Sequence, residues 1–466
     1  MEENKIEIEL EDIFSKEKKT NDIIFENINI ENNQKEINSC YQNILRNIGP
    51  GSITSSIYNL CILSLGTGLL AIPQKIGYMS IFLSPIIIIF SGLANLWSLI
   101  ILVNMCIKYR LNNYESIVNI LLGNKISIFL GIIMIINQFG IIILYQVILY
   151  KLIGGVINEI YGYGYKSVND FAINSFWNKL SIKYLVLYGI TIIILFPLCL
   201  LKNASKMRYA STFGIFSLFF LIFIIVIECP FYIKKYIIEE KQKVNFYDIY
   251  SGFKEDCKLL QSIVTVFYAF SCHVGAFPVL QTLNNPTEIR TKKVLKKAIC
   301  IDIICYLIIG ASGYLTQPLN TPDLIIERNK IFENDWLMLI GEICFIITLL
   351  AKISANYNAL RSCILILFNF DTSNFPNCLN LIITTIILLQ TTFIAINFQS
   401  ISDYISLIGS FCTVLISFFI PGIIYIKGND YPLIHYKNII TIIIISLILI
   451  LGLTSGFITI KEIINK

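Results

Sequence analysis

Charged residues are scarce in this chain of 466 residues. They make up 14% of it, whereas hydrophobic residues make up 55% and the mean hydropathy is +0.70. A chain with so few charges and so much apolar surface cannot dissolve as an ordinary globule. The composition therefore excludes a water-soluble class and predicts an integral membrane protein with several spans, whose partner is the lipid bilayer. The formal charge of +5 is small and the basic residues lie in short loops, so nucleic acid is not an expected partner.

Histidine is nearly absent, and no Cys-x-x-Cys pair occurs. The two histidines, His273 and His435, lie far apart in the sequence, so neither a metal centre nor another cofactor is expected. Most of the 13 cysteines lie singly within apolar runs and are interpreted as small core residues. The apolar runs also lack a nucleophile elbow or a pair of carboxylates, which argues against an enzyme.

A signal peptide is also missing, because residues 1–48 are polar and contain no apolar segment of the required length. We expect a flexible cytosolic N-terminal tail over residues 1–48 and a transmembrane domain over residues 49–466. Isoleucine recurs in the tail, so a short amphipathic helix is the alternative there.

Long apolar runs dominate the rest of the chain. Each has roughly 20 residues or more, enough to cross a hydrocarbon core of about 30 Å, and they predict an all-α protein of about eleven transmembrane helices. The runs cover residues 53–74, 79–107, 126–157, 182–201, 207–229, 260–282, 294–316, 334–368, 379–398, 401–426 and 438–460.

Lysine and arginine predict the orientation of these spans. Lys202, Lys206 and Arg208 crowd the link after the fourth run, and five basic residues follow the sixth run within residues 290–297. Positively charged short loops remain in the cytosol. The N-terminus is therefore predicted to be cytosolic, and eleven crossings place the C-terminus on the other side.

Two of the spans contain helix-breaking residues at mid-depth. They are Leu65–Pro73 in the first run, with the sequence LGTGLLAIP, and Tyr268–Pro278 in the sixth run, with YAFSCHVGAFP. Unwound backbone survives inside a membrane only where it is buried in protein or faces a cavity. Two discontinuous helices five spans apart are typical of a five-plus-five inverted repeat with a solute site at the midplane.

The half-helices at such breaks offer opposite charges to a ligand. Free N–H groups would attract a carboxylate, and free carbonyl groups would attract an ammonium, so an amino acid fits both. We expect its carboxylate near Gly66, Thr67 and Gly68, and its ammonium near carbonyl groups around the two breaks. The predicted substrate-binding residues are Ser64, Gly66, Thr67, Gly68, Tyr145, Phe270, Ser271 and Cys272.

Tyr145 is included because the third span carries polar residues that would face the cavity. Asn137 and Gln146 lie on the same span, and for them a second interpretation is equally good, since amide side chains often bond neighbouring helices.

Several motifs in the expected order resemble one family. Asn59-Leu60 followed by LGTGLLAIP is similar to the first-helix signature of the amino acid/auxin permease family. Residues 270–281, FSCHVGAFPVLQ, resemble its sixth helix, and residues 305–316 and 407–422 resemble its seventh and tenth. The third-span segment 143–154 also resembles the family's cavity-facing helix. The resemblance covers residues 51–430, most of the chain.

This resemblance implies a LeuT-like fold and secondary active transport of amino acids, often driven by sodium or protons. A facilitative uniporter and an amino acid sensor on the same fold are the alternatives. The chain departs from the sodium-coupled pattern at Ile62, where such members commonly carry Asn. Lys352 stands in the eighth span, where the other half of the ion site would lie, so protons are favoured over sodium.

Lys352 and His273 are the candidates for ion coupling. A lysine within a span is costly and is expected to have a role, and its ammonium could replace the ion as a tethered charge. Alternatively, Lys352 extends toward the interface or pairs with Glu342 or Asp302. His273 titrates near physiological pH, but a histidine beside a helix break can also satisfy carbonyl groups.

The substrate side chain is left open by the sequence. Neutral amino acids are the default expectation, although Asp302 or Glu342 could select cationic ones. The expected location is the plasma membrane or a vacuolar or lysosome-like membrane.

Overall fold

The structure is a computed structural model. It describes residues 51–465 apart from residues 112, 162–175, 202–207, 236–255, 319, 333–334, 369, 371–374, 398–400, 430 and 433, and the tail predicted over residues 1–48 lies outside this part. Within the described residues every regular element is a helix. The elements discussed below belong to the compact unit Ser56–Lys466, together with the first turn of α2.

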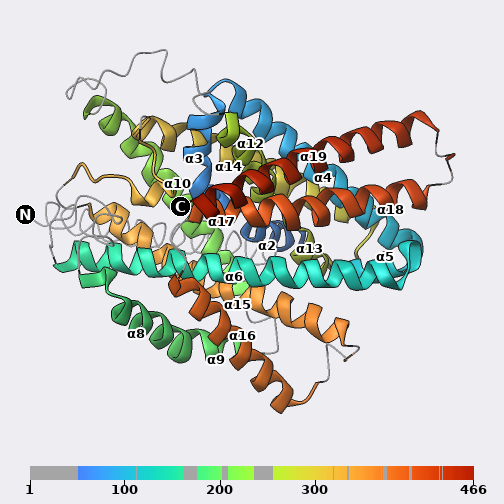
Figure 1. The fold of residues 1–466 in the computed structure, drawn as a ribbon, viewed down its shortest axis with the longest axis horizontal. Coiled ribbons are helices and arrows are strands. Elements are labelled where there is room, and N and C mark those ends of the chain that lie inside the picture. The colour runs from blue at the N-terminus through green and yellow to red at the C-terminus, as the bar shows by residue number, and fades with distance from the viewer. Residues whose placement is uncertain are drawn as a thin grey trace, which may run out of the picture. The chain divides into compact units, whose positions relative to one another are not determined.

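The helices follow the chain order shown in Figure 1. They are α2 (Ile53–Ser64), α3 (Thr67–Met79), α4 (Leu83–Tyr109), α5 (Tyr114–Leu122), α6 (Asn124–Tyr161), η1 (Phe176–Asn178), α8 (Leu180–Ile190), η2 (Thr191–Leu195), α9 (Phe196–Leu200), α10 (Arg208–Ile233), α12 (Asp256–Ala269), α13 (His273–Gln281), α14 (Glu288–Thr316), η5 (Ile325–Glu327), α15 (Trp336–Leu367), α16 (Asn377–Asn397), α17 (Ile401–Ile408), η6 (Gly409–Thr413), η7 (Leu415–Phe419), α18 (Ile420–Gly428) and α19 (Tyr436–Asn465).

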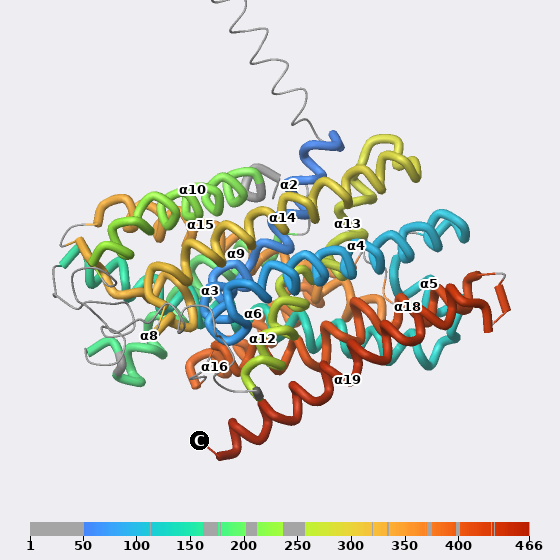
Figure 2. Tube along the Cα trace, turned by 90° about the horizontal axis from the view of Figure 1, so that it is seen from above, coloured from blue at the N-terminus to red at the C-terminus, as the bar shows by residue number. Residues whose placement is uncertain are grey.

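Ten helical runs among the described residues are long and apolar enough to cross a membrane, and the bent pair α2 and α3 makes an eleventh. Three runs join shorter helices: α8 through α9 form span four, α12 and α13 form span six, and α17 through α18 form span ten. The prediction of about eleven spans is confirmed. Figures 1 and 2 both show spans ten and eleven lying side by side, as α18 and α19.

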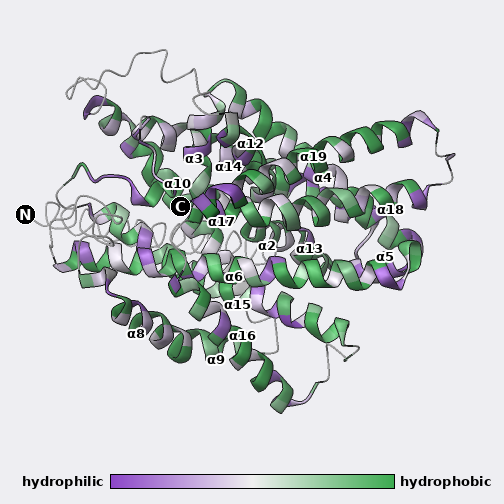
Figure 3. Cartoon of the chain, in the orientation of Figure 1, coloured by the Kyte–Doolittle hydropathy of each residue, from purple (hydrophilic) through white to green (hydrophobic). Residues whose placement is uncertain are grey.

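Polar residues face inward and apolar residues outward on several spans, as α16 illustrates. Thr384 and Thr391 are fully buried, whereas Ile386, Leu389 and Phe393 are 42–54% exposed. The threonine hydroxyls bond within the protein, so that hydrocarbon meets only apolar groups. Figure 3 shows this apolar covering as green along α16 and α19.

Hydrogen bonds at the helix ends show which spans end on the same side. Lys108 Nζ at the end of α4 donates to Gly428 O at the end of α18, 3.0 Å away. Gln281 Nε2 at the end of α13 lies 3.3 Å from Asn113 Oδ1, just before α5. Spans two, six and ten thus end together, as expected when every span crosses once.

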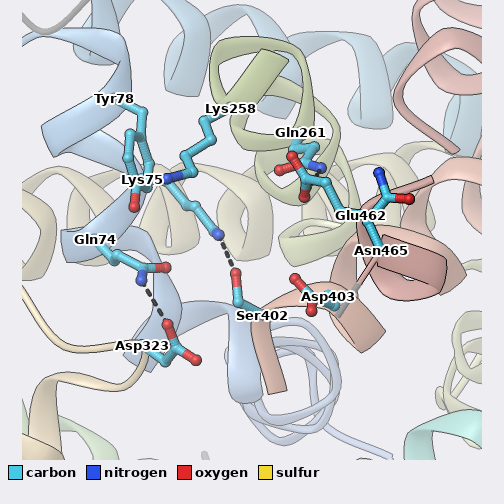
Figure 4. A pocket seen from close by; sticks show the side chains of 10 residues that line it. All are labelled: Gln74, Lys75, Tyr78, Lys258, Gln261, Asp323, Ser402, Asp403, Glu462 and Asn465. Carbon is cyan, nitrogen blue, oxygen red and sulfur yellow. Dashed lines mark hydrogen bonds between the residues drawn. The ribbon is translucent and has the colours of Figure 1, made fainter. Parts of the chain in front are cut away.

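The opposite helix ends enclose a polar cavity of about 440 Å³ (Figure 4). Lys75 Nζ on α3 donates to Ser402 Oγ on α17 at 2.6 Å, and Gln74 Nε2 donates to Asp323 Oδ1 at 2.5 Å. The C-terminal end of span one is therefore bonded both to span ten and to the segment between α14 and α15. The cavity is lined by Gln74, Lys75, Tyr78, Lys258, Gln261, Asp323, Ser402, Asp403, Glu462 and Asn465.

Candidate functional site

The first span is interrupted at Leu65 and Gly66. Helix α2 ends at Ser64 and α3 begins at Thr67, and the two helices are bent by 53°. Gly66 has φ −106° and ψ −132°, which is not a helical conformation. The break leaves backbone groups outside the regular i to i−4 ladder in the middle of a membrane, and each of them needs a partner.

Side chains satisfy the carbonyl groups at the C-terminal end of α2. Tyr306 Oη donates to Ser64 O at 2.8 Å, and Lys352 Nζ donates to Leu65 O at 2.5 Å. A helix C-terminus carries partial negative charge, so the ammonium of Lys352 lies where a cation is stabilised. Two later spans thereby hold the break in place.

The second span break lies between Ala269, which ends α12, and His273, which begins α13. Tyr306 Oη lies 2.6 Å from Ala269 O, so one hydroxyl serves the carbonyl ends of both broken helices. The ring of Phe270 packs edge-on against that of Tyr306, with centroids 4.8 Å apart. Tyr306 on α14 is therefore the side chain that joins the two breaks.

Gly68 allows the two broken spans to approach each other closely. A Cβ atom at Gly68 would lie 2.5 Å from Ala269 Cβ and 2.8 Å from Ala269 Cα. Thr67 beside it is also buried, with 1% of its surface exposed. The N-terminus of α3 and the C-terminus of α12 are thus in direct contact.

Tyr145 on α6 lies directly over the first break. Its hydroxyl would be 2.7 Å from a Cβ atom at Gly66, and its side chain is 4% exposed. The structure therefore places Tyr145 beside Gly66 and close to Ser64.

The remaining predicted residues of the sixth span contact other helices. Ser271 Oγ lies 3.0 Å from Ser417 Oγ on η7, and Cys272 is the buried residue that precedes α13. His273 Nε2 lies 2.7 Å from Ser98 Oγ on α4. His273 and Lys352 share no hydrogen-bond partner, so these two coupling candidates do not form one site.

Asp302 and Tyr306 are site residues that the predicted set omitted. Asp302 Oδ2 on α14 accepts a hydrogen bond from Ser64 Oγ at 2.5 Å. The signal was present, because Asp302 is the only acidic residue of the seventh apolar run. Among the described residues no carboxylate lies within ion-pairing distance of Lys352, so its partner is the Leu65 carbonyl rather than Glu342 or Asp302.

The other polar candidates of the third span differ in their surroundings. Gln146 Nε2 donates to Thr392 Oγ1 on α16 at 3.1 Å, which matches the helix-bonding alternative. Asn137 is buried and its Oδ1 has no hydrogen-bond partner. The side chains of Ile62 and Thr348 both pack against Gly214. An aliphatic side chain thus occupies the position where the sodium-coupled pattern has an amide.

The assembled site can bind a small dipolar molecule without chemical conversion. The first-turn N–H groups of α3 form a positive end suited to a carboxylate. Within the described residues no group of three His, Cys, Asp or Glu side chains is placed to hold a metal ion.

Comparison with known proteins identifies one family. The family model described as "Transmembrane amino acid transporter protein" matches residues 49–463. Amino acid transporter AVT6E of Arabidopsis thaliana is 23% identical over 62% of this chain and 56% of its own length. Vacuolar amino acid transporter 5 of Schizosaccharomyces pombe is 23% identical over 83% of this chain and 89% of its own length.

A Bos taurus relative, whose name contains the words "sodium-coupled neutral amino acid transporter 11", is 20% identical over 84% of this chain and 80% of its own length. Among solved structures, MhsT in complex with L-phenylalanine superimposes with a TM-score of 0.57 at 14% sequence identity. The match covers 87% of this chain and 98% of that one. The predicted LeuT-like fold is thereby confirmed.

Proposed function

Because this chain belongs to the transmembrane amino acid transporter family, we propose that it carries amino acids across a membrane as a secondary active transporter working by alternating access. It is a multi-pass membrane protein and a transporter rather than an enzyme. The observation that carries the proposal is the contact between two broken helices, bridged by Tyr306, around the unwound residues 65 and 66.

The substrate is held at the first break. Its carboxylate lies beside Gly66 and accepts from the N–H groups of Thr67 and Gly68 at the positive end of α3, because the Gly66 N–H donates to Ser64 O at 2.7 Å. The hydroxyl of Tyr145 faces the same backbone and covers the bound head group. Phe270, Ser271 and Cys272 border the substrate from the second break, where unwound backbone offers carbonyl groups to the ammonium.

A proton rather than sodium drives uptake. The Lys352 ammonium already bonds the Leu65 carbonyl, one of the backbone oxygens that a bound cation would use, and Ile62 supplies no oxygen. A second positive charge at that position would be repelled at short range in a medium of low dielectric constant. Lys352 thus takes the place of the ion, while His273 remains a second candidate for coupling.

The transporter resides in a vacuolar or lysosome-like membrane with its N-terminal tail in the cytosol. Two relatives, from Schizosaccharomyces pombe and Saccharomyces cerevisiae, carry the name vacuolar amino acid transporter 5. An acidic lumen would supply the proton gradient on which such a carrier runs.

The test is uptake of a panel of labelled amino acids into proteoliposomes under imposed sodium or proton gradients. We expect saturable uptake that an inward proton gradient stimulates and sodium does not change. The Gly66→Leu variant should lose uptake, because its side chain would displace Tyr145. The matched control is Gly189→Leu on α8, where a Cβ atom meets nothing within 4 Å.

Each outcome separates one alternative. Uptake that follows its own gradient without response to protons or sodium indicates a uniporter. Amino acid binding without uptake under any gradient contradicts transport and indicates a sensor. Uptake that requires sodium contradicts the role given to Lys352.

A further inference from the structure

Asp302 is a buried acid whose hydrogen bonding is incomplete. It is 1% exposed and lies in the middle of α14, at the depth of the helix breaks. Its Oδ2 accepts from Ser64 Oγ at 2.5 Å, whereas its Oδ1 has no hydrogen-bond partner. A carboxylate at this depth is costly, and transporters keep such groups where a proton or an ion is handled.

Opposing charges act on this carboxyl group. Asp302 bonds the last residue of α2, whose C-terminal end is negative and disfavours a second negative charge. Lys352 bonds the next residue, Leu65, and favours the ionised acid. Asp302 therefore lies between the negative end of a helix and a positively charged side chain.

The other ionisable groups near Asp302 are three thiols, one phenol and one ammonium. The charge of Asp302 acts on Cys61 on α2, Cys272 at the second break, Cys305 and Tyr306 on α14, and Lys352 on α15. Of these groups, only Lys352 acts back on Asp302 with a charge of its own. Helices α3, α4 and α10 also pack on α14, and their charged side chains bond elsewhere: Lys75 with Ser402, Lys108 with Gly428 and Glu228 with Arg328. Lys352 is therefore the cation that responds to the state of Asp302.

We propose that Asp302 carries the proton that is transported with the amino acid, an inference that rests on the proposed function. The proton binds the free Oδ1 from the side of higher proton concentration and leaves it on the other side, so no bond other than O–H forms or breaks. Protonation removes the negative charge that balances Lys352. The carboxylate of an amino acid bound at Gly66 then supplies that balance one residue away.

Proton and substrate therefore bind cooperatively. The protonated acid leaves an unbalanced ammonium, which strengthens binding of the substrate carboxylate, and by linkage the bound substrate raises the affinity for the proton. Lys352 itself is not the carrier, because its ammonium is held at the negative end of α2 by the Leu65 carbonyl. Ser64 connects proton binding with substrate binding, since its hydroxyl bonds Asp302 and its backbone ends α2 at the first break.

The experiment compares wild type with Asp302→Asn in proteoliposomes, with two measurements on each. The first is exchange of labelled for unlabelled amino acid without any gradient, and the second is accumulation driven by an inward gradient of one pH unit, which supports about tenfold accumulation for one proton. An entrapped pH indicator reports proton entry. Asparagine retains an oxygen for Ser64 but does not ionise. We expect the variant to exchange normally, to accumulate nothing and to admit no protons.

Glu342→Gln is the matched control, because Glu342 is a buried acid of α15 whose charged neighbours are Lys330, Asp335 and Arg328. This variant should retain accumulation. Gradient-driven accumulation by Asp302→Asn overturns the inference. If that variant does not exchange, Asp302→Glu decides: recovered accumulation supports the proton role, and its absence assigns Asp302 a structural role. A wild type that exchanges no amino acid refutes the proposed function itself.

Discussion

Gly66 and Gly68 lie two positions apart in one motif, yet they are small for different reasons. A side chain at Gly66 would meet the hydroxyl at the end of Tyr145, which has some freedom to move. A side chain at Gly68 would meet Ala269 at both Cβ and Cα, and backbone atoms cannot move aside without shifting a helix. The first glycine therefore serves the binding site, and the second serves helix packing.

This difference predicts that the two alanine substitutions affect different properties of the protein. Gly68→Ala should lower the stability of the protein by about 1–3 kcal/mol through overpacking, measured as a lower thermal unfolding temperature in detergent. Gly66→Ala should weaken amino acid binding and leave the unfolding temperature close to wild type. Equal loss of stability in both variants would contradict the assignment.

At the scale of elements, Arg361 joins three segments at the C-terminal ends of spans four and eight. Its guanidinium donates to Cys199 O at 3.2 Å and Leu201 O at 3.4 Å, and to Asn380 Oδ1 at 2.8 Å. It also lies 5.4 Å from the ring centre of Phe375. Arginine thus satisfies the free carbonyl groups where α9 ends.

We predict that Arg361→Met destabilises the protein by roughly 2 kcal/mol or more, because buried carbonyl groups lose their donors. Substrate preference should not change, since Arg361 contacts neither break. The measurements are thermal unfolding and relative uptake of the amino acid panel in surviving protein. Lys293→Met, at an exposed position near the start of α14, is the control and should leave stability unchanged within about 0.5 kcal/mol.

The segment that contains η5 is held by ion pairs. Lys151 Nζ lies 2.7 Å from Glu327 Oε1. Arg328 pairs with Glu228, and Lys330 pairs with Glu159. Burial raises the pKa of Glu327 above its ordinary value, which outweighs the opposing effect of Lys151. The segment therefore binds a proton at Glu327 more tightly when it is folded than when it is open.

It follows that this contribution to local stability is fully present below the ordinary pKa and is lost as the pH rises through the raised pKa. We predict that the free energy of opening of residues 324–328, measured by hydrogen exchange corrected for intrinsic rates, falls as the pH rises from about 4.5 toward neutrality. In Glu327→Gln the slope should disappear. An unchanged slope would assign it to another group.

At the scale of the whole molecule, the C-terminal ends of spans two, six and ten lie on one side, and the N-terminal end of span ten lies on the other. Span ends two, six and ten are joined through Lys108 and Gln281, whereas Lys75 bonds Ser402 at the opposite end of span ten. Two exposed cysteines lie near opposite ends, Cys257 at the start of α12 and Cys378 at the start of α16. They report the sidedness of the protein directly.

In sealed vesicles with the cytosolic face outward, a membrane-impermeant maleimide should label Cys378 and leave Cys257 unlabelled until the membrane is permeabilised. Cys378→Ser and Cys257→Ser identify the two signals. Labelling of both cysteines from one face would contradict the alternating topology, and the reversed pattern would contradict the predicted cytosolic N-terminus.

The sequence by itself determined the spans, the two breaks and the family. A bilayer requires about 20 apolar residues per helix, and a residue such as Gly66 favours an interruption, so these features are local and are visible in the sequence. The motifs in order then identified the fold. Lys352 was also visible, because a charge within an apolar run stands out.

Only the tertiary structure decided which side chains serve the breaks. Ser64 and Asp302 are 238 positions apart, and Tyr306 reaches Ser64 across 242 positions. Span seven is apolar around much of its circumference, so no periodicity indicates which face meets span one. The face of span seven that meets span one is determined by tertiary packing. Packing also places Lys352 of span eight beside the Leu65 carbonyl rather than beside a carboxylate.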